Sequence, residues 1–117
     1  MQKPLVIAAA AALVLGGGAA LAHHGWGSYY TDAVMLEGKI QESTYQNPHG
    51  MLKFTAADAK VWNVVLAPPS RMENRGLPPA MLAPGKAATV VGYVHKTEKD
   101  EMRAERITID GKTVELR

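Results

Sequence analysis

The feature that most constrains this chain is the alternation of apolar and polar residues in short segments separated by proline and glycine. In the segment 34–41, Val34, Leu36 and Ile40 fall on one face, whereas the charged and amide residues fall on the other. A period of two residues is typical of a strand with one buried face. Gly38 falls on the apolar face, where a bend in a coiled strand needs a residue without a side chain. Further strands are expected at 51–56, 60–66, 87–95, 104–109 and 112–116.

The connection between the third and fourth strands has a different character. Ala67-Pro68-Pro69 ends the third strand, and Ser70 with Glu73 fits a capping box, so we expect a short helix that starts after Ser70. Gly76 fits the C-terminal end of that helix. Three strands, one short helical connection after strand 3 and three more strands predict an all-β fold, a small Greek-key barrel of the OB type. A fragment of a β-sandwich is the alternative.

The last two strands indicate a hairpin. Asp110-Gly111 is a strong two-residue turn signal, and the register it sets places Ile107 opposite Val114.

The apolar positions expected in the core are Ile40, Leu52, Phe54, Trp62, Val64, Val90 and Ile107.

The first 22 residues have the composition of a secretory signal peptide. Lys3 gives a positive start, the run 5–15 is apolar, and the small residues Ala20 and Ala22 flank Leu21. The apolar run is shorter than the ~20 residues that a membrane span requires. We therefore expect cleavage after Ala22, no membrane span after cleavage, and a mature protein in the periplasm or secreted. The expected parts are a signal peptide (1–22), an N-terminal arm (23–32) and a small β-barrel domain (33–117).

The charge and the absence of cysteine exclude several functions. Removal of the signal takes away only Lys3, which leaves 12 of the 13 basic residues against 11 acidic residues. Such a near-neutral chain has no electrostatic footprint for nucleic acid, which we do not expect as a partner. The chain has no cysteine. Thiolate chemistry and zinc–thiolate sites are thus excluded, and a metal would need histidine, carboxylate or backbone ligands.

Histidines form the candidate site. After cleavage the chain would begin with His23-His24, so that His23 carries both a free α-amine and an imidazole. His49 lies in the loop 45–50 between Pro48, which lacks an N–H, and Gly50, which permits a positive φ. Nitrogen ligands in a planar arrangement suit Cu(II). The arrangement resembles the histidine brace of secreted copper proteins, and it makes His23, His24 and His49 the candidate copper ligands.

The alternatives remain open. We place His95 outside the site and interpret Glu98, Asp100 and Glu101 as a solvated face. In one alternative, copper takes part in an oxidoreductase. In the other, the domain is a structural or ligand-binding module without metal, whose barrel face contacts a periplasmic protein or a small molecule. The aromatics of the arm, Trp26, Tyr29 and Tyr30, either dock the arm onto the barrel or contact that ligand. The favoured hypothesis is a non-enzymatic protein whose partner is a metal ion.

Several short stretches, in this order and spacing, resemble an uncharacterised family of short exported bacterial domains, classed as a domain of unknown function. They are His23-His24, Leu36-Glu37-Gly38, Asn47-Pro48-His49, Pro84-Gly85 and Val90-Val91-Gly92-Tyr93. The likeness covers essentially the whole mature chain and implies a small periplasmic β-domain without an established activity. That family often has Ser-Phe after the paired histidines, where this chain has Gly25-Trp26.

Overall fold

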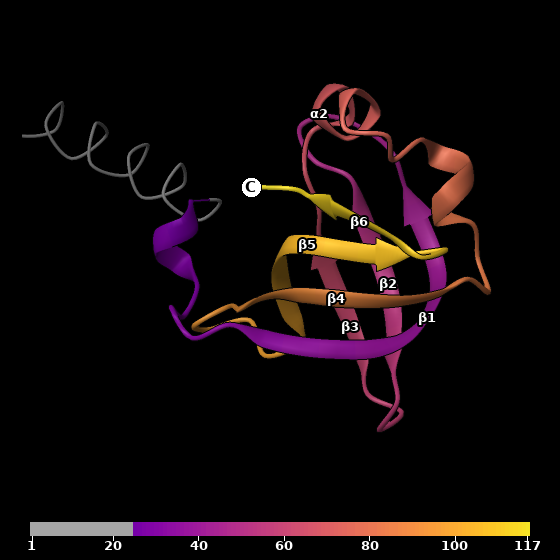
Figure 1. The fold of residues 1–117 in the computed structure, drawn as a ribbon. Coiled ribbons are helices and arrows are strands. Elements are labelled where there is room, and N and C mark those ends of the chain that lie inside the picture. Colours follow the sequence, from indigo (N-terminus) through magenta and orange to yellow (C-terminus); the bar gives the residue numbers. More distant parts are fainter. Residues whose placement is uncertain (1–24) are drawn as a thin grey trace, which may run out of the picture.

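The structure is a computed structural model that describes residues 25–117. Within these residues six strands form one sheet, and the helical pieces are short (Figure 1). The strands are β1 (Val34–Thr44), β2 (Met51–Ala56), β3 (Val61–Val65), β4 (Ala87–Val94), β5 (Glu101–Ile109) and β6 (Lys112–Glu115). The helical pieces are η1 (Trp26–Ser28), α2 (Pro69–Asn74) and η2 (Pro79–Leu82). None of the helices in this part of the chain is both long and apolar enough to cross a membrane.

The sheet closes on itself as a barrel. Its strand order is β3-β2-β1-β4-β5-β6, and a parallel pairing of β3 with the start of β5 joins the two sides. Strand β1 makes the closure possible, because its first half pairs with β4 and its second half pairs with β2. Gly38 and Lys39 pair with both strands, and a bulge between Ile40 and Glu42 follows just after the pairing with β4 ends. The predicted all-β fold, a small OB-like barrel with one short helical connection after strand 3, is confirmed.

Gly38 is required by the close approach of two strands. A Cβ atom built at this position would lie 2.0 Å from the carbonyl oxygen of Thr55, in the backbone of β2. Any side chain would therefore force β1 and β2 apart at the bend. The role that the sequence indicates for Gly38 is confirmed.

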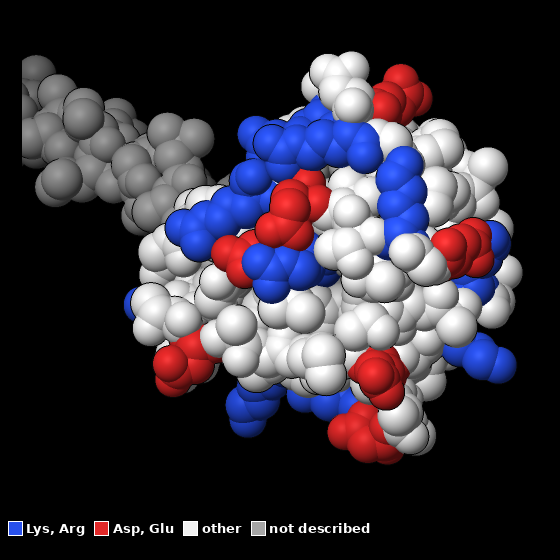
Figure 2. Space-filling model, in the orientation of Figure 1, with Lys and Arg blue, Asp and Glu red and all other residues white. Residues whose placement is uncertain are grey.

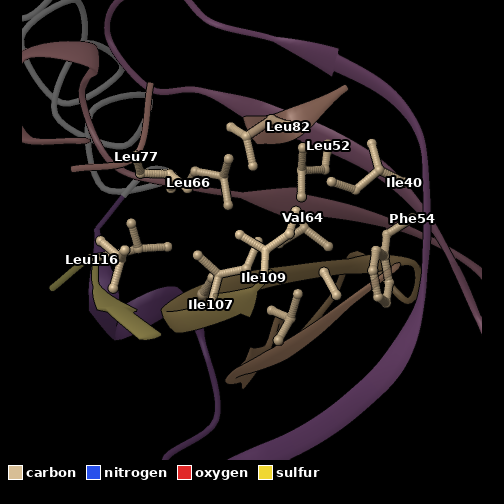
Figure 3. Packing of buried hydrophobic residues seen from close by; sticks show 14 of the residues in the cluster. Ile40, Leu52, Phe54, Val64, Leu66, Leu77, Leu82, Ile107, Ile109 and Leu116 are labelled. Carbon is tan, nitrogen blue, oxygen red and sulfur yellow. The ribbon is translucent and has the colours of Figure 1, made fainter. Parts of the chain in front are cut away.

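The barrel interior is filled by aliphatic side chains around one phenylalanine ring (Figure 3). All seven core residues predicted from the sequence are buried, and Phe54 has no exposed surface. In the β5–β6 hairpin Ile107 pairs with Val114, as the turn residues predict. The alternation of the strands thus identifies the inward face correctly.

Two expectations about element ends are wrong. Helix α2 starts at Pro69 after Pro68, and Ser70 makes no capping hydrogen bond, because a proline at the first helical position already has the required φ and lacks the N–H that a cap would satisfy. Strand β5 starts at Glu101 instead of residue 104, because residues 101–103 pair with residues 63–65 of β3. Glu101 and Arg103 therefore belong to the barrel wall.

We predict that Phe54→Ala lowers the free energy of unfolding by about 3–5 kcal/mol, because it leaves a cavity in a fully buried site. Met35→Ala, at a side chain that is 64% exposed, is the matched control and should change stability by about 0.5 kcal/mol or less. Denaturant unfolding measures both changes. A loss below about 1 kcal/mol for Phe54→Ala would contradict the placement of this ring in the core.

Candidate functional site

A hollow of about 210 Å³ lies where the loop 45–50 meets β5 and the N-terminal arm. Its floor is formed by two outward side chains, Met51 of β2 and Val65 of β3. One side is formed by Tyr29 and Glu101. The rest of its lining comes from the loop itself, with Gln46, Asn47, Pro48 and His49. In OB-type barrels this face, between the loop after the first strand and the loop before the fifth, is where ligands bind.

The loop that carries His49 is held at both ends. The Tyr45 hydroxyl donates to the carbonyl of Leu77 at 2.7 Å, and the Gly50 N–H donates to the carbonyl of Ala67 at 2.9 Å. Gly50 does not have a positive φ, so the conformational reason expected from the sequence is wrong. Its place is tightly packed instead, since a Cβ here would lie 2.7 Å from the terminal methyl carbon of Met72, which would have to move.

The imidazole of His49 is in contact with a guanidinium group. Nη2 of Arg103 lies 3.4 Å from Nε2 of His49. Arginine can only donate, so Nε2 of His49 is the acceptor of this hydrogen bond. Burial lowers the pKa of Arg103, and the charges of Arg71 and Arg117 act in the same direction. The site therefore has a positive charge beside its histidine, which sequence analysis did not identify.

Trp26 fixes the N-terminal arm next to this contact. Its ring lies between two guanidinium groups, with Cζ of Arg103 4.2 Å and Cζ of Arg117 4.4 Å from the ring centroid. The edge of Tyr93 packs against Trp26 at a centroid distance of 5.8 Å. In Figure 1 the start of the described chain accordingly lies beside the barrel wall near Arg117, at the C-terminal end. Arg103 thus contacts both the arm and His49.

Tyr29 attaches the arm a second time, to the start of β5. Tyr29 is 4% exposed, and its hydroxyl donates to Oε2 of Glu101 at 2.5 Å. The backbone of Tyr29 forms an antiparallel bridge with His95. Trp26 and Tyr29 therefore dock the arm, whereas Tyr30 is 54% exposed. The sequence left open whether the aromatics of the arm dock it onto the barrel or contact a ligand. Trp26 and Tyr29 dock the arm.

His95 lies behind Glu101. Its Nδ1 accepts the backbone N–H groups of Thr97 and Glu98 at 3.1 and 3.0 Å, which leaves the ring proton of the neutral imidazole on Nε2. That nitrogen lies 4.0 Å from Oε2 of Glu101. The ring is buried and packs edge-on against Tyr29 at 4.9 Å. The expectation of a solvated Glu101 is therefore wrong, and His95 lies directly behind the hollow.

The described residues contain no complete set of metal ligands. Among residues 25–117 no three His, Cys, Asp or Glu side chains come together as a metal-binding group. The hollow holds one histidine and one carboxylate, His49 and Glu101. The other two candidate ligands, His23 and His24, lie outside the described residues.

Basic and acidic side chains alternate on the face shown in Figure 2. Arg106 bonds to Glu115 at 2.8 Å and lies 3.3 Å from Glu105, which also pairs with Arg117 at 3.8 Å. Arg71, Arg75 and Lys112 instead bond to backbone carbonyl oxygens.

The described residues thus form a small OB-type barrel with a partly polar hollow beside the loop 45–50. The chain belongs to the family of unknown function DUF6152, which matches residues 10–103. Among curated proteins none matches this chain.

Among solved structures, the barrel is similar to part of the protein in a crystal structure of TiaS in complex with a tRNA and ATP. The TM-score is 0.50 and the sequence identity is 20%, over 73% of this chain and 18% of that chain. The likeness shows the fold alone.

Tyr29 should make the stability of the protein sensitive to alkali. Burial and, to a smaller extent, the hydrogen bond to Glu101 raise the pKa of Tyr29 well above the ordinary value near 10. In the unfolded chain the phenol loses its proton at the ordinary pKa. The stability that Tyr29 contributes is therefore fully present below about pH 10 and lost as the pH rises above it.

We predict that Tyr29→Phe makes the free energy of unfolding less dependent on pH between about pH 9 and pH 11.5. Denaturant unfolding at a series of pH values measures this dependence. Tyr30→Phe, which changes an exposed phenol, is the matched control and should follow the parent protein. Equal slopes for the parent and Tyr29→Phe would contradict the role of the buried phenol.

Proposed function

We propose that this protein is an exported, non-enzymatic β-domain that binds a metal ion, most readily Cu(II), through His23, His24 and His49. In this proposal cleavage after Ala22 releases the protein into the periplasm or the medium and creates the free α-amine of His23. The observation that supports it is the position of Trp26, which packs on the same guanidinium group that contacts His49.

The docking of Trp26 limits how far the new N-terminus can be from His49. His23 precedes Trp26 by three residues and His24 precedes it by two. Three residues of extended chain span at most about 11 Å. This span fits a site shared with His49, because Trp26 and His49 contact the same guanidinium group.

The donor types favour copper among the common metals. The amine and imidazole of His23 with a second imidazole from His49 give three nitrogen ligands, and His24 offers a further imidazole or its backbone amide. Nitrogen ligands in tetragonal geometry suit Cu(II), whereas Mg²⁺ and Ca²⁺ prefer oxygen. The incomplete donor set within residues 25–117 fits a site that the N-terminus completes.

The positive charge of Arg103 makes metal binding at this site less favourable. A metal ion that used Nε2 of His49 would displace the guanidinium group, and the positive charge would remain close to the metal. Coordination through Nδ1 of His49 would leave the contact with Arg103 in place. In either geometry, a negatively charged group close to the metal would offset the repulsion from Arg103.

A second candidate function is the binding of a small molecule or a protein of the cell envelope without metal. The hollow favours it, because its lining combines the side-chain amides of Gln46 and Asn47 with the apolar floor of Met51 and Val65. Such a mixture of apolar surface and a few polar groups is typical of ligand sites. Absence of copper binding in the correctly processed protein would favour this function.

We predict that the protein beginning at His23 binds one Cu(II) near neutral pH. One extra residue before His23 should weaken binding about tenfold or more, equivalent to about 1.4 kcal/mol or more, because the amine leaves the chelate. His49→Gln should also weaken binding, because it removes an imidazole ligand. Titration with Cu(II), followed by tryptophan fluorescence and calorimetry, measures all three proteins.

Lys53→Ala, at an exposed side chain of β2, is the control for His49→Gln. His95→Ala is unsuitable, because His95 is buried against Tyr29 and its loss would disturb the arm. Should the extended protein bind as tightly as the parent, the N-terminal amine is no ligand. Should His49→Gln bind as tightly as the parent, the metal is held by the N-terminus alone.

A further inference from the structure

We infer that Glu101 is an additional metal ligand, positioned by a hydrogen bond from Tyr29. This inference rests on the proposed function and adds an oxygen donor to its nitrogen ligands. Glu101 and His49 line the same hollow, although they come from different parts of the barrel. Glu101 is the first residue of β5, whereas His49 lies in the loop before β2.

The carboxylate of Glu101 is oriented through one of its two oxygens. The Tyr29 hydroxyl donates to Oε2 at 2.5 Å, and Nε2 of His95, which carries the ring proton, lies 4.0 Å from the same atom. Both groups are buried behind the carboxylate. Because Oε2 accepts the Tyr29 hydroxyl, Oε1 is the oxygen that we assign to the metal. The hydrogen bond from Tyr29 is an outer contact of the kind that commonly holds metal-binding carboxylates. The His95 nitrogen, at 4.0 Å, is too distant to donate a hydrogen bond to this oxygen.

The charges around the hollow also point to Glu101. Arg103 is in contact with His49, and a metal dication placed beside it would be repelled. Glu101 and Arg103 are two residues apart in β5, so they lie on the same outward face of the strand. Glu101 is the carboxylate in the lining of the hollow. Its direct binding would offset the repulsion from Arg103.

The arrangement gives Tyr29 two functions. It attaches the arm to the barrel, and it holds the carboxylate that would bind the metal. The same arm carries the N-terminal nitrogen ligands of the proposed site. Tyr29 therefore links the docking of the arm to the position of the proposed oxygen ligand.

The test compares Cu(II) binding by the protein that begins at His23 with three variants. Glu101→Gln keeps an oxygen that can accept the Tyr29 hydroxyl but removes the negative charge. Tyr29→Phe removes the hydrogen bond but keeps the carboxylate and the buried ring. Glu98→Gln changes an exposed carboxylate in the loop before β5 that does not line the hollow, and it is the matched control.

Loss of an outer hydrogen-bond partner typically costs a metal site about 10–100-fold in affinity, so we expect Tyr29→Phe to cost about tenfold. Glu101→Gln replaces the charged ligand itself, so we expect it to cost about 100-fold or more. Electron paramagnetic resonance should show a changed donor set for Glu101→Gln. The spectra of Tyr29→Phe and Glu98→Gln should keep the parent donor set. Thermal unfolding of the metal-free proteins checks that every variant is folded.

The possible outcomes separate the inference from the proposed function. If the parent protein binds no Cu(II), the proposed function fails and the inference fails with it. If the parent binds and Glu101→Gln binds equally well with the same spectrum, only the inference is overturned. If Glu101→Gln and Tyr29→Phe lose the same affinity and both keep the parent spectrum, Glu101 only docks the arm, and the inference is again overturned.

Discussion

The parallel pairing of β3 with the start of β5 is the interaction on which the rest of the structure depends. Residues 63–65 pair with residues 101–103, and this contact closes the sheet into a barrel. It also places the outward side chains of Glu101 and Arg103 next to β3 and the loop that carries His49. Closure thus brings the carboxylate of Glu101 and the guanidinium group of Arg103 close to an imidazole from a distant part of the sequence.

The N-terminal arm then uses the groups that closure has positioned. Trp26 packs between Arg103 and Arg117, and Tyr29 donates its hydroxyl to Glu101. Each contact joins an aromatic ring of the arm to a charged group of the barrel, so the arm has a defined position at the edge of the hollow. A guanidinium group over an aromatic ring contributes about 0.5–1 kcal/mol at exposed sites and more when it is desolvated. The arm is therefore part of the folded domain and part of the candidate site.

The sequence predicts the barrel well because alternation reports directly which side chains point inward. It identifies Phe54, Val64 and Ile107 as core residues and Gly38 as the residue at a close approach of strands. It predicts the site less well, because Glu101 lies in a charged run that has the composition of a solvated loop. Only the pairing with β3 converts Glu101 and Arg103 into residues of the barrel wall. The polarity of a segment does not reveal such a long-range partner, although the alternation of Glu101, Arg103 and Glu105 with buried Met102 and Ala104 is a signal that could have found it.

The central claim is that the docked arm and the loop of His49 share one metal. The most direct measurement is a crystal structure of the protein that begins at His23, grown with one equivalent of Cu(II), with anomalous scattering at the copper edge to locate the metal. The account predicts one copper in the hollow, bonded to the α-amine of His23 and to an imidazole nitrogen of His49. A copper bound only by the N-terminal residues, away from the barrel, or no copper at all, would contradict it.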